Sequence, residues 1–204
     1  MQSKTVNISI DDKVLVQQSR QGDSAAMERL ILRYQDRIYN VILKICANFD
    51  DAAELTQDTF VKIIEKIEQF EERSRFYTWA FRIAVNLTLT YCQRNVKLGL
   101  RSLDADTGQE SESVSGGTKL KDFLSNQSTP DPAELAGDRE LRQLALKALM
   151  KLDDKQRTIV VLRDIEGMSY SQIAQVLEIE AGTVKSRLSR ARSELREILE
   201  AFIQ

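Results

Sequence analysis

The sequence predicts an all-α protein, with two small helical domains joined by a flexible acidic linker. The chain of 204 residues holds only two prolines and eight glycines, so residues that interrupt helices are rare. Apolar residues recur at helical spacing over most of the chain, as in the stretch from Asp23 to Ile45. We expect an N-terminal domain at residues 1–98, the linker at residues 99–132 and a C-terminal domain at residues 133–204.

The N-terminal domain begins with a short helix from about Asp11, which ends at Gly22. Asp23 is a typical N-cap for the long second helix that follows. The run from Asn48 to Asp50 breaks the helical pattern, and a third helix is expected to start near Asp51.

The third helix carries an acidic ridge. Asp51, Glu54 and Asp58 stand at positions i, i+3 and i+7, so their carboxylates share one face. Like charges at this spacing cost a few tenths of a kcal/mol in an isolated helix. Two interpretations remain open from spacing alone, namely a solvated face and a docking surface for a basic partner.

Arginines are interleaved with aromatic residues along the next polar loop, at residues 70–76, and the helix that follows it, in the set Arg73, Arg75, Phe76, Tyr77, Trp79 and Arg82. Aromatic rings stack on unpaired bases while arginines hold the backbone, which is typical of single-stranded nucleic-acid binding. The alternative is that the aromatic residues form part of a helical core. The only tryptophan of the chain lies in this segment.

The helical pattern dissolves between residues 99 and 132. The stretch from Asp104 to Gly117 is small, polar and acidic, so it buries too little apolar surface to fold by itself. We interpret it as a flexible tether between the domains. The C-terminal domain then starts with a helix from Ala133 or Asp138 to Leu152, and Asp153 caps the next helix with Gln156 completing a capping box.

The stretch from Gly167 to Leu199 predicts a helix-turn-helix. Ser169 and Gln172 form a capping box at the start of a short helix, and a break of three residues begins at Glu178. The apolar stripe of the second helix consists of Val184, Leu188, Ala191, Leu195 and Ile198.

Polar and basic side chains of this second helix fall off the apolar stripe and point outward. Arginine reaches guanine edges with two hydrogen bonds, serine serves bases or phosphates, and lysine neutralises a phosphate. The pattern therefore favours DNA binding over an ordinary surface helix with a solvated basic face. The candidate DNA-binding residues are Thr183, Lys185, Ser186, Arg187, Ser189 and Arg190, with Arg192 as a further phosphate contact.

Composition excludes several classes of function. The chain has no histidine, which removes Ser-His-Asp and Cys-His nucleophilic sites and all histidine-ligated metal sites. No phosphate-binding loop or acid–base pair is present either. We therefore expect no enzymatic activity, cofactor, metal or small-molecule substrate. The formal net charge of -2 means that any affinity for nucleic acid depends on uneven charge placement.

The two cysteines and the N-terminus indicate a reduced, cytoplasmic protein. Cys46 and Cys92 stand alone in apolar helical settings and form no CxxC pair, so we interpret them as buried thiols, with a redox sensor as the alternative. The N-terminus lacks a basic region followed by an apolar run, and no segment is long enough to span a membrane.

The segment from Met168 to Leu177, followed by Gly182 to Arg192, closely resembles the last conserved region of bacterial sigma factors of the extracytoplasmic-function group. The resemblance implies that this helix-turn-helix reads the minus-thirty-five promoter element. Glu178 stands where the family usually has glycine or asparagine, residues suited to positive φ.

Two further segments resemble the same family, in the family's order. The run from Asp51 to Phe60 is similar to the segment that docks on core RNA polymerase, which implies contacts with the beta-prime clamp, and the second domain is expected to meet the beta flap. The polymerase contacts implied are Asp51, Glu54, Gln57, Asp58 and Phe60. The run from Phe76 to Asn86 resembles the segment that melts the minus-ten element. The DNA contacts implied are Arg73, Ser74, Arg75, Phe76, Trp79, Arg82 and Asn86.

The sequence is thus identified as a member of the sigma-70 family that directs core RNA polymerase to promoter DNA. An anti-sigma protein is a usual partner in that family. One alternative is a stand-alone helix-turn-helix regulator that binds an operator as a dimer, which leaves the acidic ridge and the aromatic segment unexplained. Another is a protein-interaction module that no longer reads DNA.

Overall fold

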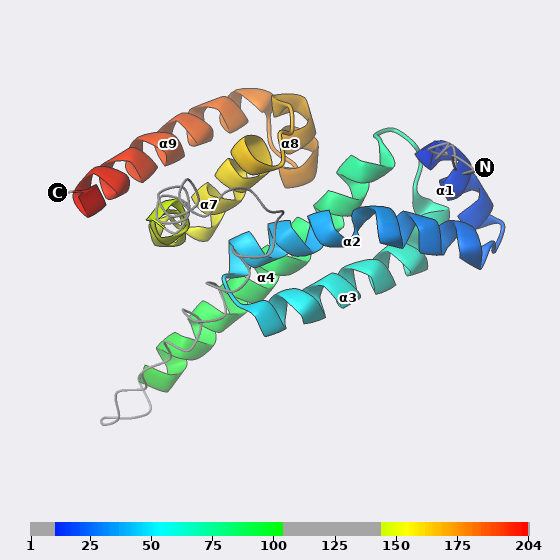
Figure 1. Ribbon diagram of the computed structural model, residues 1–204, viewed down its shortest axis with the longest axis horizontal. Helices are drawn as coiled ribbons and strands as arrows, with labels where there is room; N and C mark the ends of the chain where they lie inside the picture. Colours follow the sequence, from blue (N-terminus) through cyan, green and yellow to red (C-terminus); the bar gives the residue numbers. More distant parts are fainter. Residues whose placement is uncertain (1–10, 104–143, 204) are drawn as a thin grey trace, which may run out of the picture.

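The computed structural model describes residues 11–103 and 144–203, and these are helical with no strand among them (Figure 1). This confirms the predicted all-α class. In the first part lie α1 (Asp12–Arg20), α2 (Ser24–Cys46), α3 (Phe49–Lys66), the 3-10 turn η1 (Ile67–Gln69) and α4 (Phe76–Leu103). In the second part lie a helix at residues 144–151, α7 (Asp154–Val160), the π-helical turn η2 (Val161–Ile165), α8 (Tyr170–Leu177) and α9 (Ala181–Ile203).

The boundary expected at residue 98 falls inside α4, which continues to Leu103. The rest of the predicted linker, and the predicted start of the C-terminal domain at residues 133–143, lie outside the described residues.

Side-chain caps set the helix starts of the N-terminal domain. The predicted N-cap Asp23 is confirmed, because its carboxylate accepts hydrogen bonds from the backbone N–H groups of Ala25 and Ala26. Helix α3 begins at Phe49, two residues before the expected start, since the Asn48 side chain already accepts from the first turn.

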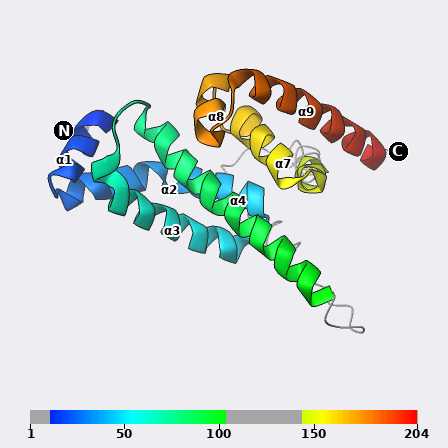
Figure 2. The same cartoon turned by 180° about the vertical axis from the view of Figure 1, so that it is seen from behind.

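Helices α2, α3 and α4 pack side by side around an apolar core, with α1 across one end of α2 (Figure 2). The α2 side chains Leu30, Ile38, Ile42 and Ile45 are fully buried there, as the helical period predicted. Phe81 of α4 is the largest fully buried side chain. Removing this apolar surface from water is the main stabilising term of the domain.

The C-terminal domain confirms one predicted capping box and corrects the other. Ser169 and Gln172 satisfy each other's backbone N–H groups at the start of α8. At α7, Asp153 accepts from the backbone N–H of Gln156, but the Gln156 side chain donates to Glu194 instead of returning to Asp153. The side chain of Gln156 thus pairs with Glu194 on α9 instead of closing the local capping box.

The two domains pack against each other. Helix α8 lies against α4, while α7 and η2 contact α2. This contact places the helix-turn-helix beside the aromatic segment, although the two are far apart in the sequence, as the hydrogen bond from Arg82 to Glu178, 96 residues later, illustrates.

Candidate nucleic-acid interface

In the helix-turn-helix, one face of α9 is polar and exposed, and the opposite face is a buried apolar stripe. Val184, Leu188 and Ala191 of α9 are buried, which confirms the predicted inward stripe over the first three turns. Of the candidate DNA-binding residues, Thr183 is half-buried and the others are exposed: Lys185, Ser186, Arg187, Ser189 and Arg190. A helix whose basic and hydroxyl side chains stand free of the core has the chemistry required to enter a DNA major groove.

The turn between α8 and α9 forces Glu178 into the left-handed region. Its φ is 54° and its ψ is 45°, and its backbone N–H donates to the carbonyl of Ala174. The sequence indicated this conformation, because glycine or asparagine is the residue that such a turn favours. The turn is therefore formed at a conformational cost of about 1–2 kcal/mol.

Arg192 forms an ion pair with Asp164. Its guanidinium donates two hydrogen bonds to the carboxylate of Asp164 in η2, a bidentate pair that ties α9 to the preceding turn. The sequence suggested Arg192 as a phosphate contact, and in this arrangement its donors face Asp164 instead.

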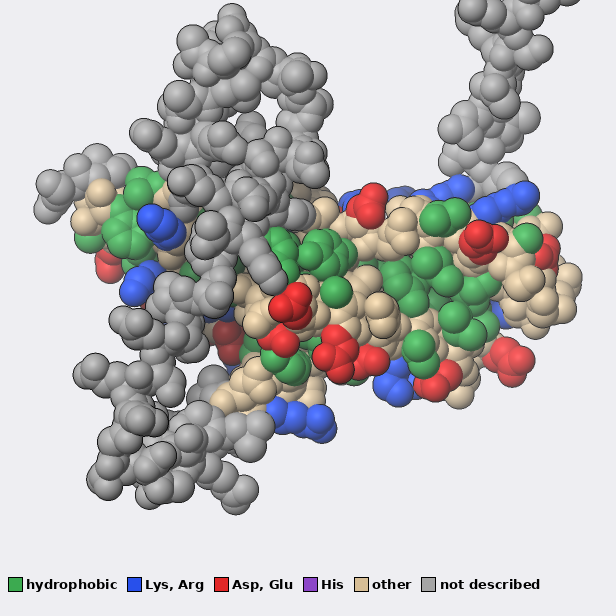
Figure 3. Space-filling view, turned by 60° about the horizontal axis from the view of Figure 1, so that its bottom comes forward, with side chains coloured by type: hydrophobic (Ala, Val, Ile, Leu, Met, Phe, Trp, Pro, Cys, Tyr) green, Lys and Arg blue, Asp and Glu red, His purple; other side chains and the backbone are tan. Residues whose placement is uncertain are grey.

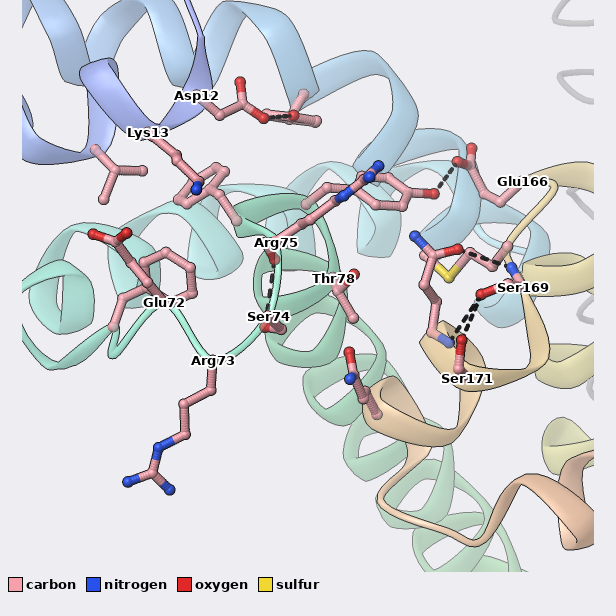
Figure 4. Close-up of a pocket in the computed structure, with 18 of the residues that line it drawn as sticks. Asp12, Lys13, Glu72, Arg73, Ser74, Arg75, Thr78, Glu166, Ser169 and Ser171 are labelled. Atoms are coloured by element: carbon pink, nitrogen blue, oxygen red, sulfur yellow. Dashed lines mark hydrogen bonds between the residues drawn. The ribbon is translucent and has the colours of Figure 1, made fainter.

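A cleft of about 1140 Å³ lies between the loop at residues 71–75 and the start of α8 (Figure 4). The loop contributes Arg73, Ser74 and Arg75, which were predicted to contact the minus-ten element. In Figure 4 Arg73 extends away from the cleft, and its side chain is 85% exposed while it pairs with Glu71 at 2.8 Å. Exposed pairs of this kind contribute little, so the guanidinium can exchange Glu71 for another anion.

The loop also contains a non-glycine residue in the left-handed region, which the sequence did not indicate. Glu72 has φ 56°, and its carboxylate accepts a hydrogen bond from Arg20 of α1 at 3.3 Å. Arg20 also donates to the carbonyl of Ile67. Through Arg20, helix α1 is thus hydrogen-bonded both to η1 and to the loop that follows it.

The predicted aromatic contacts belong to the core. Phe76 is 4% exposed and Trp79 is 9% exposed. Both rings pack against Phe70, with centroids 6.0 Å and 5.0 Å away. Both rings are buried within this aromatic cluster, so base stacking on them requires the cluster to open. Arg82 is half-buried and Asn86 is exposed on α4.

Two carboxylates of the C-terminal domain pair with arginines of α2 and α4. Arg82 pairs with Glu178 at 3.3 Å. The carboxylate of Glu166 accepts from Arg37 at 2.8 Å and from the Tyr77 hydroxyl at 2.9 Å. Burial, together with the Glu166 charge, raises the pKa of Tyr77, which keeps its hydroxyl protonated as a donor. Arg37 and Glu166 carried no signal in the sequence that marked them as a pair.

The exposed face of α3 combines acidic and apolar side chains. Glu54, Gln57 and Asp58 are exposed, whereas Phe60 is only 8% exposed and belongs to the core. Asp51 is half-buried and hydrogen-bonded to Tyr91 of α4.

Further along the same face, Val61 and Ile64 are 52% and 49% exposed. Residues 54, 57, 58, 61 and 64 share one side of the helix by their spacing. Figure 3 brings this side of the molecule forward and shows apolar side chains exposed between charged ones. A helix face that combines exposed apolar and charged side chains in this way is typical of a protein-docking surface.

Comparison with known proteins identifies the family. The sequence model described as "Sigma-70 region 2" matches residues 30–97, and the one described as "Sigma-70, region 4" matches residues 142–195. The ECF RNA polymerase sigma-E factor of Haemophilus influenzae is 33% identical over 196 residues, which are 96% of this chain and 96% of that protein. The chain belongs to the ECF sigma factors. The sigma-E factor of Escherichia coli K12 is 32% identical over 96% of this chain and 97% of its own length.

Two solved structures share the fold. The sigma factor RpoE from Bartonella quintana, solved in complex with the anti-sigma factor NepR, is 27% identical, with a TM-score of 0.61 over 85% of this chain and 96% of that one. CnrH, solved in complex with the cytosolic domain of CnrY, has a TM-score of 0.63 at 24% identity over 93% of this chain and 97% of its own. The region 2 match contains α3 and most of α4, and the region 4 match contains α7, α8 and most of α9.

Within residues 11–103 and 144–203, no helix is both long and apolar enough to cross a membrane.

Proposed function

We propose that this chain binds core RNA polymerase through α3 and directs it to promoters, with α9 reading the minus-thirty-five element and the segment at residues 73–86 engaging the minus-ten element. The observation that carries the proposal is the exposed polar face of α9, opposite the buried side chains of Val184, Leu188 and Ala191, within the matched region 4. In this function the chain supplies sequence recognition, and the chemistry of RNA synthesis belongs to the polymerase.

The roles of individual residues on α9 follow from their side chains. Ser186, Ser189 and Arg190 stand exposed and suit base edges, whereas Lys185 and Arg187 suit phosphates. A stand-alone operator-binding regulator accounts for α9 but leaves the exposed face of α3 without a partner, which is why we favour polymerase binding.

Docking through α3 is tested by co-elution with bacterial core RNA polymerase in gel filtration. The test variant is Glu54→Arg/Asp58→Arg, because both side chains are exposed and neither takes part in the contact between Asp51 and Tyr91. The control is Glu197→Arg/Glu200→Arg, which makes the same charge change on the far end of α9.

We expect the wild type and the control to co-elute with the polymerase and the test variant to elute alone. A wild-type protein that stays free of polymerase while it binds double-stranded DNA would replace the sigma-factor proposal with the operator-binding regulator. Co-elution of all three proteins would show that docking on the polymerase does not depend on Glu54 and Asp58 of α3.

A regulatory protein partner is the second part of the proposal. RpoE and CnrH were both solved in complex with another protein, NepR and the cytosolic domain of CnrY. The structural match with this chain extends over almost the whole length of both proteins. We infer that an anti-sigma protein binds this chain and competes with polymerase. The test is whether a protein that co-purifies with the chain is displaced by added core polymerase.

A further inference from the structure

We propose that Arg20 of α1 is a positioning residue, which restrains the loop at residues 71–75 in the conformation in which the loop meets the minus-ten element. Arg20 then contributes to the choice of promoter without touching DNA itself. The consequence for promoter choice rests on the proposed function. The restraint on the loop rests on contacts within the N-terminal domain alone.

The guanidinium of Arg20 contacts the chain on both sides of the point where the loop begins. Its Nε donates to the backbone carbonyl of Ile67 in η1 at 3.1 Å, and its Nη1 donates to the carboxylate of Glu72 at 3.3 Å. The guanidinium carbon also lies 5.8 Å from the centroid of the Phe70 ring. One side chain of α1 therefore joins three nearby residues, although it stands 47 positions before Ile67 and 52 before Glu72.

The backbone of Glu72 determines where the rest of the loop points. Its φ of 56° is rare for residues with a Cβ atom, and such a conformation persists only where surrounding contacts fix it. The ion pair with Arg20 supplies a contact of this kind. Directly after Glu72, Arg73 extends away from the cleft with its side chain 85% exposed (Figure 4). A rotation at Glu72 would redirect Arg73 and Arg75 together, because both follow it in the chain.

The far end of the loop is anchored by other contacts. Phe70 and Phe76 flank the loop, both are buried, and their rings pack edge to face with centroids 6.0 Å apart. The backbone N–H of Trp79 donates to the carbonyl of Arg75 at 3.2 Å, which joins the end of the loop to the first turn of α4. The part of the loop around Glu72 is thus where the contact with Arg20 has most effect.

A restrained loop favours both tight and selective binding. A loop that is fixed before it meets DNA loses less conformational entropy on binding, which increases affinity. It also discriminates better, because a loop that rearranges easily accepts a second base in place of the first. Arg20 suits this indirect role, since two of its N–H groups already donate to protein acceptors and its side chain is only 28% exposed.

Trypsin provides a direct measure of the restraint. It cleaves after Arg73 and Arg75, and cleavage requires the loop to leave its folded conformation and enter the active site of the protease. We would follow both cleavages by mass spectrometry in the full-length wild type, in Arg20→Gln, in Glu72→Ala and in the double variant. This readout does not depend on polymerase or on DNA.

We expect Arg20→Gln and Glu72→Ala each to raise the rate of cleavage about three- to tenfold, which is the size of effect expected for a partly exposed, charge-assisted contact. The double variant should be no faster than the faster single variant, because both changes break the same contact. The charge-matched controls are Arg29→Gln and Glu28→Ala, at exposed positions of α2, and they should stay within about twofold of the wild type.

A second measurement asks whether the restraint affects promoter choice. Each chain is assembled with core RNA polymerase, and the holoenzyme is bound to a pool of single-stranded oligonucleotides with a randomised segment, which is then sequenced. We expect the enrichment of the preferred base over the other three to fall about three- to tenfold at one or more positions for both single variants. Co-elution with the polymerase should stay unchanged, which separates this effect from a general loss of fold.

Unchanged cleavage in Arg20→Gln and Glu72→Ala would overturn the restraint on the loop. Faster cleavage with unchanged base enrichment would overturn its role in promoter choice. Weaker oligonucleotide binding for Arg20→Gln together with tighter binding for Glu72→Ala would mean that Arg20 contacts phosphates directly, since the two side chains would then act on DNA as opposite charges. That result would overturn the indirect role.

Failure of the proposed function is seen separately. It appears as a wild-type chain that does not co-elute with core polymerase, or as a holoenzyme that enriches no sequence from the pool. The role in promoter choice would then fall with it. The cleavage rates of the free chain would still decide whether Arg20 restrains the loop.

Discussion

The guanidinium of Arg157 donates a hydrogen bond to the backbone carbonyl of Ile45, 112 residues earlier in the chain. Ile45 lies in the last turn of α2, where carbonyl groups have no partner within the helix. The same guanidinium donates to the carbonyls of Leu149, Met150 and Leu152, at the end of the helix at residues 144–151. One buried cation thus satisfies the negative ends of two helices from two domains.

Replacing Arg157 by lysine should lower the free energy of unfolding by about 2–4 kcal/mol, because an ammonium group cannot reach four carbonyls and leaves buried acceptors unpaired. Urea denaturation followed by circular dichroism measures the change. Arg196→Lys, an exposed position on α9, is the matched control and should stay within about 0.5 kcal/mol of the wild type. A loss for Arg157→Lys as small as that of the control would mean that water replaces the guanidinium without cost.

Glu178→Gly should raise the free energy of unfolding by about 1 kcal/mol. Glycine adopts φ 54° without the clash that a Cβ atom makes, and the exposed ion pair with Arg82 that is lost contributes less than that. Thermal unfolding of the full chain measures the gain. Glu178→Gln separates strain from charge, since it removes the pair but keeps the Cβ atom, and it should give no gain. A stabilising Glu178→Gln would instead assign the cost to the carboxylate.

The local features of the fold were largely predictable from the sequence. Caps at Asp23 and Ser169 and the apolar stripe of α9 involve residues three or four positions apart, and those rules act within one helix. Gln156 is a case that such local rules do not predict. Its partner Glu194 lies on another helix, and no local pattern reveals that contact.

The candidate site was predictable only in part, for the same reason. Arginines and aromatic rings interleaved along a loop and the following helix predicted a nucleic-acid surface, but some of these side chains are buried and others are exposed. Phe76 and Trp79 face Phe70 in the core, while Arg82 meets Glu178 of the other domain. Burial depends on which element packs on which face, and α8 packs on α4 although the two helices are far apart in the sequence, as the 96 residues between Arg82 and Glu178 show.

Cys92 should resist alkylation in the folded protein. Burial, with a smaller contribution from the nearby Asp154 carboxylate, raises the pKa of the Cys92 thiol from 9.0 to about 12. At pH 8 the folded state then has about a thousandfold less thiolate than the unfolded state. Iodoacetamide labelling of a Cys46→Ser variant, followed by mass spectrometry, should be at least about 100-fold slower without denaturant than in urea.

The same shift predicts a dependence of stability on pH. A thiol whose pKa is higher in the folded state stabilises the fold fully below its unfolded pKa, near 9.0, and this contribution is lost as the pH rises towards the folded value of about 12. Cys92→Ala should remove that part of the alkaline destabilisation. Fast labelling of folded Cys92 at pH 8 would contradict both expectations and restore the redox-sensor interpretation.

Arg190 and Lys185 should affect DNA binding differently, although both are exposed on the same face of α9. If Arg190 pairs with a guanine, Arg190→Ala should cost about 1–3 kcal/mol on the preferred promoter and relax discrimination at one base pair. If Lys185 neutralises a phosphate, Lys185→Ala should weaken binding to all sequences alike and reduce the salt slope by about 1.

The measurement is a titration of the polymerase holoenzyme with promoter DNA at several salt concentrations, on the preferred sequence and on single-base variants of the minus-thirty-five element. Arg196→Ala is the control, since Arg196 is exposed six residues beyond Arg190 and therefore points from another side of α9. Equal losses on all sequences for Arg190→Ala would assign Arg190 to the phosphate backbone, and base reading would then fall to Ser186 and Ser189.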